Sequence, residues 1–257
     1  MGKFMAISGK GGVGKTTIAG LLVTRLIARG CKPVLAIDAD PNTCLDAALD
    51  VHVLKTIGGI REEARDIAGK GMAGGISKQE LLELKIAQCM VEADGFDLIA
   101  MGRPEGPGCY CYANNVLKTV IQEISANYPY VVLDNEAGLE NLSRRIVQQL
   151  DVLIMVADPS MMGLQTVKRL YDLAEEMDIR YKRLVIIVNR LRNGQQLPDA
   201  ALELKSMTGA SLIVGLPDDV HLAELFEKGE SLWSVTGHHP AAISLDDLLT
   251  ELEIYCK

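Results

Sequence analysis

Short apolar runs alternate along the chain with longer amphipathic stretches. Seven of these runs are strand-sized and rich in valine, isoleucine and leucine: residues 4–8, 33–38, 96–102, 130–134, 151–157, 183–189 and 211–217. Because most are continuous rather than alternating, they are typical of strands that are covered on both faces. Helical patterns lie between them, for example over residues 16–30 and 162–177. The pattern predicts an α/β fold with a mostly parallel sheet of seven to eight strands and helices on both faces.

One segment, residues 44–94, interrupts this alternation. It is rich in glycine over residues 67–77, shows no clear strand pattern and ends in a helical stretch over residues 81–92. We interpret it as an insertion over the sheet. The chain of 257 residues is then a single domain, residues 1–257.

The first predicted strand is followed at once by GKGGVGKTT, residues 9–17. These residues match G-x-x-x-x-G-K-[ST], in which backbone N–H groups and a helix N-terminus surround phosphates. The same glycines also fit the dinucleotide pattern G-x-G-x-x-G, with Asp38 as a ribose-binding acid. Lys15 and Thr16 decide between the two, because they provide a lysine for a γ-phosphate and a hydroxyl for Mg²⁺. The loop therefore predicts a nucleoside triphosphate site formed by Gly11, Gly12, Val13, Gly14, Lys15, Thr16 and Thr17.

Carboxylates end two of the predicted strands. IDADPN (37–42) places Asp38 and Asp40 at one strand end, where Mg²⁺ and the attacking water of a nucleotidase lie. VVLDNEAGLE (131–140) closes an apolar strand on Asp134, the Walker B pattern of a Mg²⁺-holding aspartate. Asp38 is expected to support the Mg²⁺ shell, with a helix N-cap as the alternative. For Glu136, a switch carboxylate and a plain loop acid both remain open.

A loop after the third predicted strand contains two cysteines, Cys109 and Cys111, within GRPEGPGCYCYANN. In an extended or turn backbone, this spacing lets both sulfurs face the same side. Thiolates suit Zn²⁺, Ni²⁺, Cu(I) or an iron–sulfur cluster. Since a closed metal site usually takes four ligands, two copies of the chain would complete it.

The octapeptide KGGVGKTT resembles the deviant Walker A motif of SIMIBI-class, MinD/ParA-type ATPases. Together with IDADPN, the Cys-Tyr-Cys loop and DNEAGLENLSRR, it makes the chain similar over residues 3–220 to the CooC/AcsF family. Members of that family are nickel-insertion ATPases that mature carbon monoxide dehydrogenase and acetyl-CoA synthase.

The resemblance implies MgATP hydrolysis by a homodimer that binds Ni²⁺ or Zn²⁺ through Cys109 and Cys111 of each subunit. It further implies that Lys10 reaches the partner's phosphates and that Asp40 orients the attacking water. The resemblance also implies an adenine pocket, which would be formed in this chain by Asn189, Arg190 and Pro217. Asn189-Arg190-Leu191-Arg192 lacks the aspartate that reads guanine in GTPases, which favours ATP.

The amino-acid composition limits the kinds of partner that we expect for this protein. A net charge of −8 and a pI near 5.1 disfavour nucleic acid, and no apolar run approaches the roughly 20 residues of a spanning helix. We therefore expect a cytoplasmic protein with no membrane contact. The resemblance implies that its client is carbon monoxide dehydrogenase or acetyl-CoA synthase. An iron–sulfur cluster scaffold or carrier ATPase and a MinD/ParA-type positioning ATPase remain the alternatives.

Overall fold

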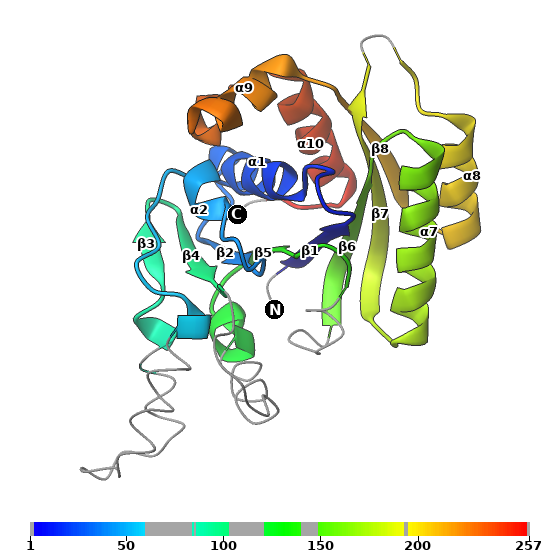
Figure 1. The fold of residues 1–257 in the computed structure, drawn as a ribbon. Helices are drawn as coiled ribbons and strands as arrows, with labels where there is room; N and C mark the ends of the chain where they lie inside the picture. The colour runs from blue at the N-terminus through cyan, green and yellow to red at the C-terminus, as the bar shows by residue number, and fades with distance from the viewer. Residues whose placement is uncertain are drawn as a thin grey trace.

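The computed structural model describes residues 3–59, 84, 86–102, 121–139, 149–192 and 195–255. Its strands form one eight-stranded sheet in the order β3-β4-β2-β5-β1-β6-β7-β8 (Figure 1). The strands are β1 (Lys3–Gly9), β2 (Val34–Asp38), β3 (Val91–Ala93), β4 (Phe96–Ala100), β5 (Tyr130–Asp134), β6 (Gln149–Ala157), β7 (Arg180–Leu191) and β8 (Leu212–Pro217). The helices with both ends in the described residues are α1 (Lys15–Ala28), α2 (Leu45–Ala48), α7 (Met161–Glu176), α8 (Asp199–Thr208), α9 (Val220–Lys228), η1 (Leu232–Ser234) and α10 (Pro240–Glu251).

The seven predicted strands are all present, and they pair in parallel with one another. The expectation that residues 44–94 contain no strand is wrong at β3, which pairs antiparallel with β4. Three half-exposed residues are too few to show a periodic pattern. The signal that could have revealed β3 is Asp94-Gly95, a hairpin turn dipeptide in which Gly95 has φ of +85°.

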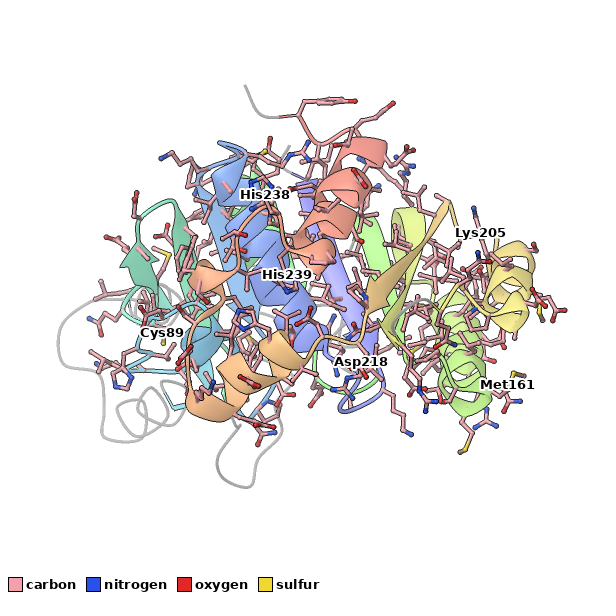
Figure 2. All side chains as sticks on the ribbon, turned by 90° about the horizontal axis from the view of Figure 1, so that it is seen from above. Cys89, Met161, Lys205, Asp218, His238 and His239 are labelled. Atoms are coloured by element: carbon pink, nitrogen blue, oxygen red, sulfur yellow. The ribbon has the colours of Figure 1, made fainter. Side chains whose placement is uncertain are left out.

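Alternating side chains of the central strands face two separate apolar clusters. Met5 and Ile7 of β1 pack with α1 and α10, whereas Ala6 between them faces the cluster that contains α7 and α8 residues. Figures 1 and 2 show α7 and α8 side by side at the β7–β8 end of the sheet. Both faces are therefore covered, as continuous apolar strands require. Among the described residues, we find no helix with the length and apolar character to cross a bilayer.

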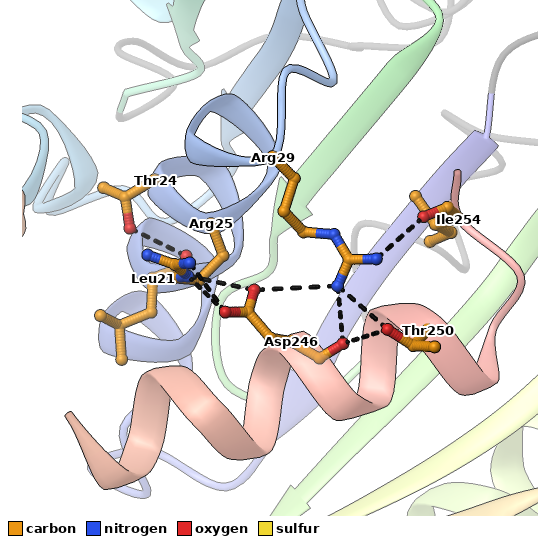
Figure 3. Close-up of polar contacts among 7 residues, drawn as sticks. All are labelled: Leu21, Thr24, Arg25, Arg29, Asp246, Thr250 and Ile254. Carbon is orange, nitrogen blue, oxygen red and sulfur yellow. Dashed lines mark hydrogen bonds and ion pairs between the residues drawn. The ribbon is translucent and has the colours of Figure 1, made fainter. Parts of the chain in front are cut away.

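A cluster of charged and polar contacts fastens α10 to α1 (Figure 3). Arg25 donates through Nε and Nη2 to the carboxylate of Asp246, with the shortest contact at 2.7 Å. Arg29 donates through Nη1 to the backbone oxygen of Asp246 and to Thr250 Oγ1. Because the Arg25 and Asp246 side chains are only 13% and 25% exposed, solvent screens this forked ion pair less than a surface pair.

Asp246→Ala is expected to lower the free energy of unfolding by about 1–3 kcal/mol, because it leaves the Arg25 guanidinium without its carboxylate. The matched control is Asp247→Ala, which removes the same charge from an exposed position of the same helix. Urea denaturation measures both variants, and the control is expected to stay within about 0.5 kcal/mol of the parent. Equal losses in the two variants would contradict a specific role for the Arg25–Asp246 pair.

Candidate functional site

The segments singled out in the sequence meet at the carboxyl edge of the sheet. The glycine-rich loop follows β1, Asp38 ends β2, Asp134 ends β5 and Asn189 lies near the end of β7. In the strand registers, Asp134 pairs with Ile7 on one side and with Asp38 on the other. This edge lies where the crossovers change direction, because β1 connects to β2 on one side of it and β5 connects to β6 on the other. Open α/β sheets bind ligands at such a point.

The loop between β1 and α1 lies against its neighbours so closely that two of its glycines are required. A Cβ on Gly9 would meet the backbone oxygen of Val156 at 2.5 Å, and one on Gly14 would meet Asn189 Nδ2 at 2.5 Å. Gly14 also has φ of +93° as the N-cap of α1. Lys15 is 7% exposed and donates from Nζ to the backbone oxygen of Lys10 at 3.3 Å, so its ammonium is held along the loop.

The other predicted loop residues lie around this lysine. Val13 is buried, Thr16 and Thr17 are half-buried, and Lys10, Gly11 and Gly12 are exposed. A loop whose backbone is exposed at the start of a long helix can direct N–H groups at an anion. The geometry is that of a phosphate-binding loop.

Asp134 is joined to this loop by one short hydrogen bond. Thr16 Oγ1 donates to Asp134 Oδ2 at 2.6 Å, while Asp134 Oδ1 is buried and has no hydrogen-bond partner within the described part of the chain. Burial raises the pKa of Asp134 to about 7 against the opposing effect of the Thr16 bond, and the Asp38 carboxylate adds to the rise. A buried oxygen without a partner is costly, which marks this position as one built for a further ligand.

The properties of Mg²⁺ fit this position. Magnesium takes oxygen ligands, keeps several waters and is usually bound through one or two carboxylates together with substrate phosphates. The unpaired oxygen of Asp134 and the adjacent hydroxyl of Thr16 provide such donors beside the phosphate-binding loop. A cation there would also remove the cost of a buried negative charge on Asp134.

Asp38 is fully buried, and its carboxylate organises the chain that follows β2. Oδ1 accepts from the backbone N–H of Asp40 at 3.0 Å, and Oδ2 accepts from those of Cys44 and Leu45 at 2.9 Å each. Burial raises the pKa of Asp38 to about 6, although these backbone bonds act in the opposite direction. Asp38 therefore accepts from backbone N–H groups at the start of α2, but it is not the N-cap residue that the alternative expected, because Cys44 holds that position. The loop that Asp38 fixes includes Asp40.

The segment after β5 is hydrogen-bonded to the end of β1, where the phosphate-binding loop begins. Asn135 donates from Nδ2 to the backbone oxygen of Ile7 at 3.0 Å. Gly138 donates its backbone N–H to Gly9 at 3.2 Å and accepts from Ser8 Oγ at 2.5 Å. Movement of this segment is thus linked to the phosphate-binding loop. Glu136 is half-buried within it.

A pocket of about 300 Å³ opens beside the loop and α1. Asn189, Arg190 and Pro217, the predicted base-binding residues, all line it. Asn189 donates from Nδ2 to the backbone oxygen of Val13 at 2.8 Å, which leaves the side-chain oxygen available to accept from an amino group.

The sequence pattern did not reveal the outer wall of this pocket. That wall consists of Leu222, Ala223 and Phe226 on α9 together with Ala241 at the start of α10. An apolar wall of this kind suits the flat face of a base. Nothing in the local sequence of α9 distinguishes a pocket wall from an ordinary amphipathic helix.

Cys109 and Cys111 lie outside the described residues. In the described part of the chain, no three His, Cys, Asp or Glu side chains gather in a way that could hold a metal ion.

Comparisons with known proteins agree with this geometry. Residues 4–232 match the family described as the CobQ/CobB/MinD/ParA nucleotide binding domain. An uncharacterized ATP-binding protein of Methanocaldococcus jannaschii is 38% identical over 251 residues, covering 96% of this chain and 97% of that protein. The carbon monoxide dehydrogenase accessory protein CooC of Rhodospirillum rubrum is 32% identical over 198 residues, covering 73% of this chain and 74% of that protein.

Among solved structures, the septum site-determining protein MinD of Pyrococcus horikoshii, complexed with Mg-ADP, superposes with a TM-score of 0.70. It is 19% identical, and the match covers 99% of this chain and 97% of that one. The likeness confirms the predicted fold, an eight-stranded, mostly parallel sheet with helices on both faces. With the phosphate-binding loop at its carboxyl edge, the chain belongs to the CobQ/CobB/MinD/ParA family of P-loop nucleotide-binding proteins.

Proposed function

We propose that this protein is a MgATP-hydrolysing metallochaperone that assists nickel insertion into carbon monoxide dehydrogenase or acetyl-CoA synthase. The observation that carries the ATPase part is the contact between Thr16 and Asp134, with its unpaired carboxylate oxygen, beside the buried Lys15. A purely structural aspartate at this position would be expected to have both oxygens paired.

Each residue of the site has a role in this proposal. Gly11, Gly12, Val13, Gly14 and Thr17 surround the phosphates with Lys15, and Asn189, Arg190 and Pro217 hold the adenine. Thr16 and Asp134 hold Mg²⁺, with Asp38 supporting its shell through the loop that it organises. The bound Mg²⁺ neutralises charge that develops on the phosphates. Asp40 orients the attacking water, and its backbone N–H bond to Asp38 fixes where it stands.

Dimerisation completes both the ATP site and the metal site. Lys10 is exposed at the loop, so its side chain is free to reach the phosphates of a second subunit. Cys109 and Cys111 of two subunits together supply four thiolates for one Ni²⁺ or Zn²⁺. If the same dimer contact gathers both sites, ATP and metal affect each other's affinity reciprocally.

The nickel assignment rests on two observations. The chain carries the Cys-Tyr-Cys loop, and it is similar over about three quarters of its length to the CooC accessory protein. The name of that relative supports carbon monoxide dehydrogenase as the proposed client, and the sequence motifs keep acetyl-CoA synthase as the second proposed client.

Lys15→Ala is expected to abolish detectable ATP binding, because it removes the cation of the phosphate-binding loop. Asp40→Ala is expected to retain binding but to lower the turnover rate by about 10²–10⁴-fold, since orienting the water matters mainly in the transition state. Calorimetric titration and steady-state phosphate release measure the two effects. Glu203→Ala removes an exposed carboxylate of α8 and serves as the control. Parent-rate hydrolysis by Asp40→Ala would overturn its assignment.

Anaerobically purified protein is expected to bind one Ni²⁺ or Zn²⁺ per dimer, and Cys109→Ser/Cys111→Ser none. The affinity should fall as the pH drops, because the thiols must lose their protons. Titration followed by charge-transfer absorption, together with gel filtration, measures stoichiometry and dimerisation. Cys44→Ser, which removes an exposed free thiol, is the control. Two metals per dimer in the parent would contradict a shared site, and bound iron with inorganic sulfide would indicate a cluster carrier instead.

Without Mg²⁺ and nucleotide, the stability of the fold is expected to fall with rising pH because of Asp134. Its pKa rises from 3.8 to about 7 on folding, so the folded state binds this proton more tightly. The stabilising contribution is complete below about pH 4 and is lost as the pH rises through about 7. Asp134→Asn keeps an acceptor for Thr16 but does not ionise.

The measurement is the free energy of unfolding of the parent and of Asp134→Asn, in urea, across this pH range. The parent should lose stability relative to the variant as the pH rises. Parallel pH profiles would show that Asp134 is not a strained buried carboxylate.

A further inference from the structure

Helix α9 forms the outer wall of the base pocket, yet few apolar contacts hold it in place. All nine residues of α9 are described, and Leu225 alone among them is buried. Leu222 is partly buried against the main cluster, while Val220 is 72% exposed and Phe226 is 37% exposed. A helix this short is marginal by itself, so its position depends on how its ends are attached.

The N-terminus of α9 is connected to the N-terminus of α10 by two capping hydrogen bonds and one close histidine–carboxylate contact. Asp219 caps α9, because its Oδ1 accepts from the backbone N–H of Leu222 at 3.1 Å. Its other oxygen, Oδ2, lies 3.1 Å from His239 Nε2. His239 in turn caps α10, because its Nδ1 accepts from the backbone N–H of Ala241 at 3.2 Å.

The contacts of His239 define which ring nitrogen carries the hydrogen. Nδ1 of His239 must present its lone pair to Ala241, so the ring hydrogen sits on Nε2, the atom that lies next to Asp219 Oδ2. The His239 and Asp219 side chains are only 12% and 20% exposed, which strengthens a polar contact with a carboxylate. The ring of His221 lies nearby, with its centroid 6.2 Å from that of His239.

Both ends of this series of contacts reach the base pocket. Leu222 and Ala241, whose backbone N–H groups it satisfies, are lining residues, and Asp219 itself lies at the rim. Figure 2 shows His239 at the connection between α9 and α10, with Asp218 beyond it at the end of β8. Since Arg25 and Asp246 fasten α10 to α1, His239 stands on a part of the molecule that is fixed relative to the phosphate-binding loop.

We propose that His239 is a positioning residue for the nucleotide base, which holds the α9 wall against the pocket through Asp219. The inference rests on the proposed function, since it requires that the pocket takes a nucleotide. His239 acts through Asp219 and Leu222, and within the described residues its side-chain polar contacts are with Asp219 and Ala241 rather than with the phosphate-binding loop. A wall that grips the base equally before and during hydrolysis contributes to affinity and leaves the turnover rate unchanged.

His239→Asn separates the two tasks of this side chain. Asparagine is a good N-cap and keeps an acceptor for Ala241, but it is too short to reach Asp219. Asp219→Ser is the complementary change, because serine can still cap α9 while losing His239. His238→Asn, in the adjacent exposed histidine, is the matched control.

The experiment measures the dissociation constants of MgATP and of magnesium tripolyphosphate, together with kcat. Both single variants are expected to bind MgATP roughly tenfold more weakly, as the loss of one close polar contact with a carboxylate predicts. Tripolyphosphate binding and kcat should match the parent, because tripolyphosphate has no base. The double variant should be no weaker than either single variant, since both remove the same interaction. His238→Asn should behave as the parent.

The outcomes separate this inference from the proposed function. A parent protein that binds no MgATP overturns the proposed function. A parent that binds MgATP, with His239→Asn binding it equally well, overturns the positioning role alone. Equal losses for MgATP and tripolyphosphate would show a general structural defect and would also overturn it.

Discussion

Two carboxylates, Asp38 and Asp134, end adjacent parallel strands in direct register inside the protein. Burying two such groups side by side opposes their ionisation, and the chain meets this cost differently for each. Asp38 accepts three backbone N–H bonds from the loop that it fixes. Asp134 accepts one bond from Thr16, and its other oxygen has no partner among the residues that the structure describes. The Asp38 carboxylate is therefore used to hold the backbone in place, whereas the Asp134 carboxylate remains available for a ligand.

The loops around the site depend on this pair. Asp38 fixes the chain from Asp40 to α2, and Thr16 links Asp134 to the first turn of α1. Contacts from Gly138 to Gly9 and from Asn189 to Val13 attach two more segments to the phosphate-binding loop. A ligand that changes the charge at Asp134 therefore acts on several segments at once, which is the property needed for a nucleotide switch.

The sequence predicted those elements that a short stretch of the chain specifies by itself. Continuous apolar runs predicted seven strands, and the Gly-Lys-Thr loop predicted the phosphate site. The short antiparallel strand β3 was not predicted, because three residues are too few to show a periodic pattern of apolar positions. For Asp38, the sequence left two roles open, since a strand-ending aspartate looks the same whether it caps a helix or supports a metal. The link from Asp219 to His239 joins residues 20 positions apart through two helix ends, and no motif signals such a contact.

We propose that Asp134 Oδ1, which has no hydrogen-bond partner in the described part of the chain, holds Mg²⁺ delivered with ATP. The most direct test is the ATP affinity of the parent and of Asp134→Asn, measured by calorimetry with and without Mg²⁺. We expect Mg²⁺ to strengthen ATP binding strongly in the parent and little in the variant. Without Mg²⁺ the variant should bind ATP at least as tightly as the parent, because a buried charge is gone. An equal gain from Mg²⁺ in both proteins would contradict it.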